Sequence, residues 1–216
     1  MYIPAAFAET DPERLAALIG DYNFGLLVTA GAQGLFATHL PFVVDPAGPL
    51  ERLHAHMAKA NPHWRDVGEG LDALAIFQGP HAYVSAAWYA NRRVPTWNYT
   101  AVHVYGRLRI LQRPQEVLDV LARTVAHQEA HRPVPWRIED QPEGYIRGMA
   151  NGVVALELEV ARVEGKAKLS QNVPRADQEG ALAGLLREGD ALSLATAAAM
   201  RRACGLDANT GKDEPQ

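Results

Sequence analysis

Cysteine is almost absent from this chain, because Cys204 is the only one among 216 residues. A single cysteine excludes an intramolecular disulfide and any metal site built from several thiolates. Long apolar runs are missing too, and none approaches the roughly 18 residues that a membrane-spanning helix requires. The first residues contain neither a basic stretch nor an apolar core of the kind found in secretory signals. We therefore expect a cytoplasmic protein without a membrane attachment.

Positive charge is also in short supply. The chain has 21 Lys and Arg against 25 Asp and Glu, which gives a formal net charge of −4. Broad affinity for nucleic acids depends on neutralising phosphates with Lys and Arg, so this composition argues against it and leaves only a local basic patch as a route. The sequence has no Gly-x-Gly-x-x-Gly, phosphate-loop, His-Glu-x-x-His or Gly-x-Ser-x-Gly pattern. We predict no catalytic residue and no metal ligand.

Proline and turn residues mark the predicted secondary structure. Helices are expected to begin at Asp11-Pro12, Asn61-Pro62, Pro114 and Pro142, because an Asn or Asp N-cap and a first-turn proline favour a helix start. Alternating or continuous apolar patterns predict strands over residues 24–30, 34–45, 50–58, 73–78, 81–89, 102–111 and 154–160. Strands dominate the first half without regularly intervening helices. We therefore predict a mainly β (α+β) protein, an antiparallel β-barrel with peripheral helices.

The C-terminal quarter is predicted to be helical. Residues 165–172 read as a polar turn after the last strand, and the next segment carries Leu182, Leu185 and Leu186 at helical spacing. We expect one domain over residues 1–188, with C-terminal helical elements, followed by an Ala-rich helix and a tail over residues 189–216. Residues 205–216 contain almost nothing to bury, so we expect them to be disordered.

The segment VPTWNYTAVHVYG, residues 94–106, holds more aromatic and polar side chains than a strand requires. Trp97, Asn98 and Tyr99 stand just before an alternating stretch that carries His103 and Tyr105. Flat aromatic rings beside an amide and a histidine can hold a flat heterocycle and recognise its edge. An aromatic core cluster with satisfied polar groups would give the same pattern. The segment alone leaves both interpretations open.

Three other polar groups call for an explanation. The first is Thr38 to Pro41 inside an apolar strand, and the third is the stretch GKAKLSQN, residues 165–172. The second is HAHMAKANPHW, residues 54–64, in which Lys59 and Asn61 stand where a strand gives way to a helix. A cation beside a helix start can hold a phosphate, although a lysine at a strand end is commonly just solvated. His54 and His56 share one face of a strand, which would also suit a metal pair.

Taken in order along the chain, these segments resemble the PaiB-type family of FMN-binding negative transcriptional regulators. The resemblance runs from Met1 to about Leu186 and rests on the stretches MYIPAAF, ATHLPFVVD, HMAKANPHW, IFQGPHAYVSAAWY, VPTWNYTAVHVYG and EGKAKLSQN. It implies an FMN-binding split β-barrel related to the pyridoxamine-phosphate-oxidase-like flavoproteins. Those proteins usually form homodimers with FMN in a groove between subunits. Binding to DNA is implied by this resemblance alone.

FMN presents a dianionic phosphate, a flexible ribityl chain and a planar ring system with polar edges. The resemblance and this chemistry together give the candidate cofactor-binding residues Thr38, His39, Leu40, His56, Lys59, Asn61, Trp97, Asn98, Tyr99, Lys168 and Gln171. Two positions depart from the family pattern. Lys59 stands where Arg is usual, which keeps the charge but loses the bidentate fork. Ala167 stands where Trp is usual, which removes an aromatic wall.

Several functions are compatible with these residues. The first is an FMN-binding regulator that represses transcription. The second is a flavin-dependent reductase or oxidase, in which His56, His103 or Tyr99 would handle protons and the flavin would carry the chemistry. Related barrels also handle haem, for which His39 or His81 would be the ligand. The last is a barrel that has lost its cofactor and acts only by binding partners.

Overall fold

The protein folds as two compact units, described by a computed structural model for residues 1–32, 34–45, 48, 50–68 and 70–206. The barrel unit comprises Thr10–Phe77 and Val102–Glu164, and the terminal unit comprises Met1–Glu9, Gln78–Ala101 and Gly165–Gln216. Three long strands contribute residues to both units, namely β5 (Leu71–Val84), β6 (Thr96–Leu111) and β7 (Val153–Lys168). Each unit has its own hydrophobic core.

Antiparallel strands close into a barrel. The remaining barrel strands are β2 (Phe24–Gly31), β3 (Gly34–Val44) and β4 (Arg52–Ala58). The order is β7-β4-β3-β2-β5-β6, and a further pairing of β6 with β7 joins the two ends. The register places Leu27 opposite Thr38 and Ala55 opposite Leu156. The predicted mainly β, α+β architecture with an antiparallel barrel is confirmed.

Alternation along the strands fills the barrel interior. On β4, Leu53, Ala55 and Met57 are buried, because every second side chain of a strand points to the same face. Helix α1 (Pro12–Asp21) adds Leu15 and Ile19, four residues apart on one helical face, to the same core. It begins as predicted, since the Asp11 side chain accepts a hydrogen bond of 2.9 Å from the Glu13 amide.

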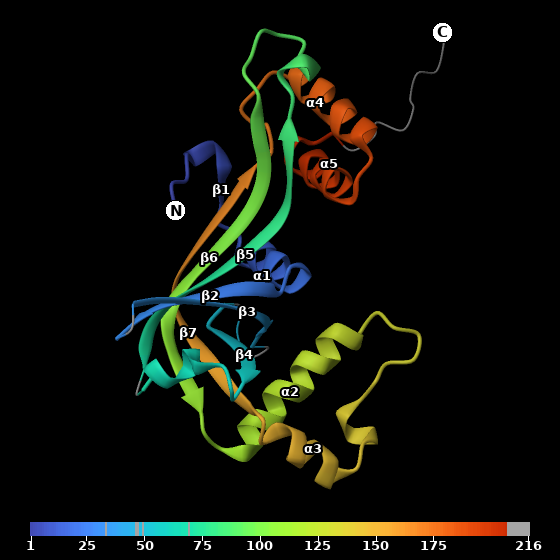
Figure 1. Ribbon diagram of the computed structural model, residues 1–216. Helices are drawn as coiled ribbons and strands as arrows, with labels where there is room; N and C mark the ends of the chain where they lie inside the picture. Colours follow the sequence, from blue (N-terminus) through green and yellow to red (C-terminus); the bar gives the residue numbers. More distant parts are fainter. Residues whose placement is uncertain (33, 46–47, 49, 69, 207–216) are drawn as a thin grey trace. The chain divides into compact units, whose positions relative to one another are not determined.

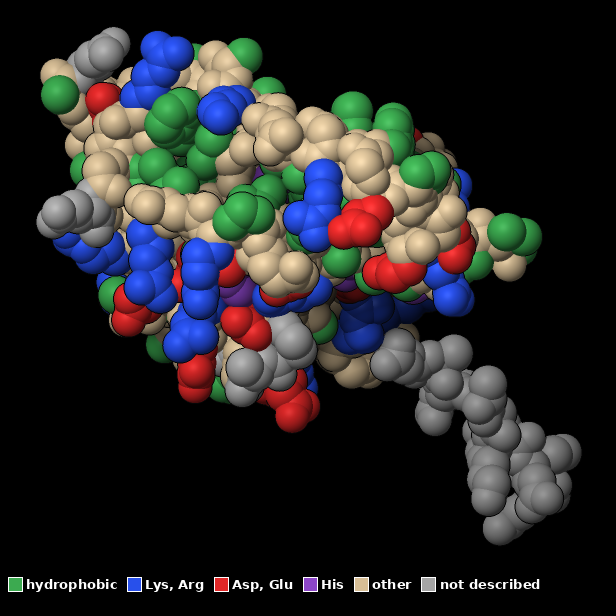
Figure 2. Space-filling model, turned by 90° about the horizontal axis from the view of Figure 1, so that it is seen from below, with side chains coloured by type: hydrophobic (Ala, Val, Ile, Leu, Met, Phe, Trp, Pro, Cys, Tyr) green, Lys and Arg blue, Asp and Glu red, His purple; other side chains and the backbone are tan. Residues whose placement is uncertain are grey.

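Two further helices belong to the barrel unit. Helix α2 (Pro114–Glu129) packs on β3 and β4, and it also contacts α3 (Glu143–Ala150), which lies beside it in Figure 1. Many of their charged side chains form local ion pairs, such as Arg147 with Glu143 at 2.7 Å. On the face shown in Figure 2, Lys and Arg side chains lie among Asp and Glu side chains. Positive charge is therefore not segregated on that face.

The terminal unit is built around two helices, α4 (Arg175–Glu188) and α5 (Ala191–Cys204), which pack together (Figure 1). Gly184 on α4 permits close packing with the 3-10 helix η3 (Ala86–Trp88), because a Cβ at Gly184 would lie 2.1 Å from the Trp88 ring. Another 3-10 helix, η1 (Ala5–Phe7), precedes the short strand β1 (Ala8–Glu9), which pairs with β7.

Three predicted element boundaries were wrong. Residues 73–78 and 81–89 were expected as two strands, but β5 continues through Gly79-Pro80 and ends at Val84. The pairing of β5 with β2 ends at Ile76, so the missing N–H of Pro80 removes no bond from that ladder. Strand β6 begins at Thr96 rather than Val102. Strand β7 extends to Lys168, so the first half of the expected polar turn is strand.

The remaining expectations concern the C-terminus and the membrane. The Ala-rich segment forms α5, as predicted, and ends at Gly205, whose positive φ of 59° suits a glycine. Most of the expected tail, residues 207–216, lies outside the described residues. Within the described ranges, none of the helices combines the length and the apolar character needed to traverse a bilayer.

Candidate functional site

The first candidate region is the corner where β4 ends and the 3-10 helix η2 (Pro62–Asp66) begins. Asn61 caps η2 as predicted, since its side-chain oxygen accepts a hydrogen bond of 3.0 Å from the His63 amide. However, η2 is a five-residue 3-10 helix, so it provides little of the helix dipole that the predicted phosphate cradle invoked. Attraction for an anion at this corner therefore depends on the charge of Lys59.

A buried histidine that the sequence reading did not single out organises this corner. The His63 ring contacts two hydroxyl groups, Thr29 Oγ1 at Nε2 and Thr38 Oγ1 at Nδ1, each at 2.8 Å. Asn61 Nδ2 also donates to Thr38 Oγ1, at 3.3 Å. Burial lowers the pKa of His63, so its ring is neutral near pH 7. The polar groups of Thr38 and Asn61 thus tie β2, β3 and η2 together.

Lys59 is held rigidly through its backbone and not through its side chain. Its amide donates to the Gly152 carbonyl at 2.8 Å, and its carbonyl accepts a hydrogen bond of 2.9 Å from Trp64 Nε1. Its ammonium group makes no hydrogen bond or ion pair with any residue that the structure describes. The side chain is exposed. The position is therefore fixed while the charge is available to a ligand.

A pocket of about 490 Å³ opens beside Lys59. Most of its walls are apolar and come from Trp64, Leu111, Val117, Leu118 and Val154. Its polar groups are two cations, Lys59 and Arg147, and two carboxamides, Gln112 and Asn151. Small-molecule sites typically have such mainly apolar walls with a few polar groups, and volumes of roughly 300–1,000 Å³.

The two histidines of β4 have different surroundings. His54 is buried and its Nε2 lies 2.9 Å from Glu157 Oε2, so its polar capacity is used inside the fold. His56 has a buried Nδ1 with no hydrogen-bond partner among the described residues, and burial lowers its pKa. No set of three or more metal-binding side chains was found in the part of the chain that is described. Of these two histidines, His56 is thus the one with a ring nitrogen that makes no hydrogen bond to the described residues.

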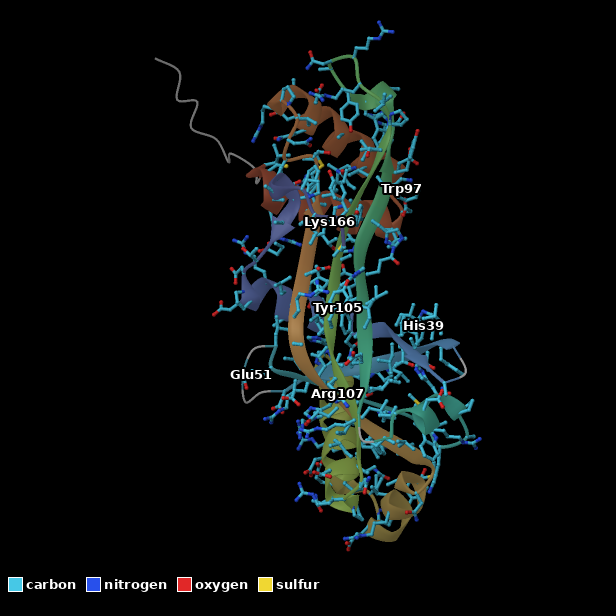
Figure 3. The ribbon with its side chains drawn as sticks, turned by 90° about the vertical axis from the view of Figure 1, so that its left-hand side faces the viewer. His39, Glu51, Trp97, Tyr105, Arg107 and Lys166 are labelled. Carbon is cyan, nitrogen blue, oxygen red and sulfur yellow. The ribbon has the colours of Figure 1, made fainter. Side chains whose placement is uncertain are left out.

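The neighbouring β3 candidates separate to two faces. Leu40 points into the core, so only its backbone could meet a ligand. His39 is exposed (Figure 3), and it stacks on Phe24 with ring centroids 5.8 Å apart. The two residues are adjacent in a strand, which explains why one side chain is buried and the other is not.

In the terminal unit, a side-chain hydrogen bond joins two signature segments, TWNY (residues 96–99) and KLSQN (residues 168–172). Asn98 is fully buried, and its Nδ2 donates to Ser170 Oγ at 2.9 Å, which joins the TWNY segment to the KLSQN segment. Trp97 is 54 % exposed, whereas Tyr99 is half-buried with Lys166 Nζ 5.2 Å from its ring centre. Trp97 and Lys166 come from the neighbouring strands β6 and β7 (Figure 3). Asn98 therefore serves the fold, and Trp97 is the open side chain.

Lys168 and Gln171 also make bonds within the terminal unit. Lys168 Nζ donates to the Trp97 carbonyl at 2.6 Å and to Thr96 Oγ1. Burial and the nearby Lys166 charge lower the pKa of Lys168. The Gln171 amide accepts from the Leu169 amide at 2.7 Å and donates to the Ala167 carbonyl at 2.6 Å. Both side chains therefore hold the KLSQN turn in place.

A polar pocket of about 320 Å³ adjoins Lys168. Arg92 and Arg93 also line it, together with Thr96, Ser170 and Asn172. Arg93 forms an ion pair with the buried carboxylate of Asp177, so its charge is already balanced. Hydrogen bonds from Arg93 and Asn91 outweigh burial and lower the pKa of Asp177. Of the adjacent arginines Arg92 and Arg93, Arg93 is therefore held in an ion pair.

The predicted candidates thus belong to two separate groups. The barrel unit holds Thr38, His39, Leu40, His56, Lys59 and Asn61, and the terminal unit holds Trp97, Asn98, Tyr99, Lys168 and Gln171. Hydrogen bonds bring Thr38 to Asn61, and Lys168 to the backbone of Trp97. Lys59 and Trp97 keep a charge or a ring surface that a ligand could reach, whereas the unpartnered Nδ1 of His56 is buried.

Comparison with known proteins gives a consistent picture. A family model described as "Putative FMN-binding domain" matches residues 1–162. Over 188 residues the chain is 34% identical to the protease synthase and sporulation protein PAI 2 of Bacillus subtilis, covering 87% of this chain and 90% of that protein. The expected resemblance to the PaiB-type family is confirmed.

Solved structures of similar fold include two cofactor proteins. The FAD and heme binding protein from Mycobacterium smegmatis has a TM-score of 0.56 at 16% identity, covering 82% of this chain and 79% of that one. The flavocytochrome Anf3 from Azotobacter vinelandii has a TM-score of 0.52 at 13% identity, covering 74% of this chain and 68% of that one. At these identities the likeness concerns the fold, and it supports the expected split barrel.

Proposed function

This chain belongs to the FMN-binding domain family that includes PAI 2, and from that premise we propose that it binds FMN and represses transcription. One observation of the structure carries the flavin part. Lys59 has a fixed backbone and an ammonium group without a partner among the described residues, and it stands at the wall of a mainly apolar pocket. A dianionic phosphate attached to a flat ring system matches such a pocket.

The residues of the pocket fit the parts of FMN. Lys59 would neutralise the phosphate, whereas Arg147 already pairs with Glu143 and would add only part of its charge. The carboxamides of Gln112 and Asn151 can donate to and accept from polar edges, while Trp64 and the aliphatic walls exclude water. When bound, FMN would supply a redox-active ring whose chemistry belongs to the cofactor.

The first experiment is the visible absorption spectrum of the purified full chain before and after addition of FMN. We expect flavin bands that stay with the protein through gel filtration. A colourless protein that leaves added FMN behind on the column would overturn the flavin proposal. In that case a barrel that acts only through partners becomes the better description.

We also propose that the chain forms a homodimer through an exposed apolar face of β2 and β3. Phe24 and Leu35 are 67% and 82% exposed, and they point to the same face as Leu26, Val28 and Ala37. Contiguous apolar surface of this kind commonly marks an interface in a soluble protein. Light scattering should report a dimer, and Leu35→Asp should yield a monomer. Val134→Asp, at another exposed apolar residue, is the matched control.

The regulatory part of the proposal rests on family membership. Deletion of the gene should raise transcription of the genes that the protein represses, and an unchanged transcript profile would contradict repression. A mobility-shift assay with the DNA upstream of its own gene at low salt then separates two routes. Retarded DNA supports direct repression, and its absence assigns regulation to a protein partner.

A flavin-dependent oxidoreductase is the second candidate, favoured by His56. Its buried Nδ1 has no partner among the described residues, and its lowered pKa keeps the ring neutral near pH 7 and able to accept a proton. Turnover of bound flavin that depends on a nicotinamide or on oxygen would support this function. His56→Asn should then slow turnover and leave FMN affinity unchanged, and equal rates would contradict the role of His56.

A further inference from the structure

A second pocket of the terminal unit is aromatic and acidic. It measures about 350 Å³, and its side chains include four rings, His81, Tyr83, Trp88 and Trp97, with the carboxylates of Glu188 and Asp190. Its lining contains no Lys or Arg. The pocket beside Lys168 in the same unit contains three cations and no carboxylate. The two pockets are therefore suited to ligands of opposite charge.

The sequence explains how the rings come together. His81 and Tyr83 are two residues apart on β5 and so share one face of the strand. Trp97 on β6 lies 6.4 Å from the His81 ring and 6.1 Å from the Tyr83 ring, the latter at 70°. Tyr83 and Trp97 are 48% and 54% exposed. This edge-on arrangement leaves aromatic surface open to a ligand.

The carboxylates come from the junction of two helices. Glu188 is the last residue of α4, Gly189 turns the chain with φ of 73°, and Asp190 caps α5. The negative end of the α4 dipole adds to the charge of Glu188. A hydrogen bond from the Ser193 hydroxyl lowers the pKa of Asp190, and so do the bonds that its Oδ1 accepts from the Ser193 and Leu192 amides, at 3.1 and 3.0 Å. Asp190 is therefore ionised near neutral pH.

We propose that this aromatic–acidic pocket binds an organic ammonium cation with alkyl substituents on nitrogen. A cation over the face of a Trp or Tyr ring is attracted by the ring quadrupole, and nearby carboxylates add to that attraction. The same carboxylates repel anions, and among the described residues no three metal-ligating side chains come together to hold a metal ion. The volume suits a small molecule. The pocket is made without Lys59, so this proposal goes beyond FMN binding.

The test compares two probes of the same shape. Choline and 3,3-dimethylbutan-1-ol differ in that a quaternary nitrogen in the first is a carbon in the second. Titration of the full chain, followed by NMR of the probe methyl groups, should show upfield shifts for choline from the ring currents. We expect the dissociation constant of choline to be lower by at least about tenfold. Equal affinities, or no binding of choline, would overturn the proposal.

Variants separate the contribution of the carboxylate charge to choline binding from that of the aromatic rings. Glu188→Gln should weaken choline about threefold to tenfold and leave the neutral probe unchanged. Glu179→Gln is the matched control, since Glu179 is an exposed carboxylate on the same helix that pairs with Arg175. Trp97→Leu should abolish the upfield shift, while Trp97→Phe should retain part of it. If Glu188→Gln weakens choline no more than the control does, the acidic half of the site is contradicted.

The proposal can fail independently of flavin binding. Glu188→Gln should leave the absorption spectrum of added FMN and its retention on gel filtration unchanged. Loss of choline binding in a protein that still holds FMN would therefore concern this pocket alone. Because Glu188 is exposed, we expect the variant to fold, and circular dichroism checks this.

Discussion

Lys59 and Lys168 were both expected to contact the cofactor, and their surroundings differ completely. In the barrel unit, hydrogen bonds fix the backbone of Lys59 on both sides and leave its ammonium group available. In the terminal unit, the Lys168 ammonium is itself the bonded group, donating to the Trp97 carbonyl and to Thr96. The comparison teaches that a motif lysine can be a ligand-binding residue or a structural one, depending on which of its atoms the fold uses.

The difference has an energetic basis. An ammonium group in water loses little when a phosphate replaces its hydration, and it gains a charge-assisted hydrogen bond. An ammonium group that already donates to a carbonyl must break that bond first, and it leaves an unsatisfied acceptor behind. We therefore propose phosphate binding for Lys59 and a structural role for Lys168, and three substitutions and one pH measurement test this division.

The largest effect is expected from Lys59→Ala. Loss of a charge-assisted hydrogen bond to phosphate should weaken FMN by about 10- to 100-fold, while riboflavin, which lacks the phosphate, should bind as before. Stability should not change, because the ammonium supports no contact among the described residues. Fluorescence titration with both flavins measures this. Arg52→Ala, at an exposed cation on β4, the strand that precedes Lys59, is the control. Equal weakening of riboflavin would contradict the phosphate assignment.

Asn98→Ala should break the link between the two signature segments. The side chain is fully buried and exchanges hydrogen bonds with Ser170. Its removal should lower the free energy of unfolding by about 1–3 kcal/mol, because a buried hydroxyl loses its partner. Denaturant unfolding measures the change. Asn151→Ala, an exposed amide in the barrel unit, should have little effect on stability. A stable Asn98→Ala protein would show that the link is dispensable.

Lys168→Met should lower stability and leave FMN affinity nearly unchanged, which is the reverse of what we expect for Lys59→Ala. The apolar stem is kept and the donor is lost, so the free energy of unfolding should fall by about 1 kcal/mol. FMN affinity should change by less than about threefold. Thermal unfolding and flavin titration of the same sample report both quantities. A large loss of FMN affinity would mean that Lys168 leaves its carbonyl partner to bind the cofactor.

The smallest effect concerns pH. The pKa of Lys168 is lowered from 10.5 by burial and by Lys166, so between the folded pKa and 10.5 the unfolded chain binds more protons than the native one. The contribution of Lys168 to the free energy of unfolding therefore rises as the pH increases through that window. Lys168→Met lacks the effect, so the stability difference between wild type and variant should widen in mild alkali. A difference that is constant or narrows with pH would contradict the lowered pKa.

The helix starts were predictable because their causes are local. Asp11 before Pro12 and Asn61 before Pro62 each satisfy an amide within two residues, which the sequence displays directly. The break expected at Gly79-Pro80 was wrong because the cost of a proline in a strand depends on whether a neighbouring strand needs its N–H, and the pairing of β5 with β2 ends at Ile76, before Pro80.

Motif order along the chain nominated the candidate site residues, and it did not assign their roles. The family match over residues 1–162 covers the candidates up to Tyr99, and cofactor binding by the candidates stays a prediction. His63 was missed because its role depends on Thr29 and Thr38, which stand 34 and 25 residues away in sequence. The aromatic–acidic pocket was missed for the same reason, since its rings come from two strands and its carboxylates from a helix junction.

The sequence by itself determined the antiparallel barrel and the helix starts, and it nominated residues for a flavin site. The barrel and the helix starts follow from periodicity and capping chemistry, which act over a few residues. Only the tertiary structure decided which polar atoms are used up inside the fold, as at Asn98, Gln171 and Lys168, and which remain available, as at Lys59 and Trp97. The physical reason is that hydrogen bonds and burial depend on partners brought together by strand pairing, whose positions a linear pattern does not contain.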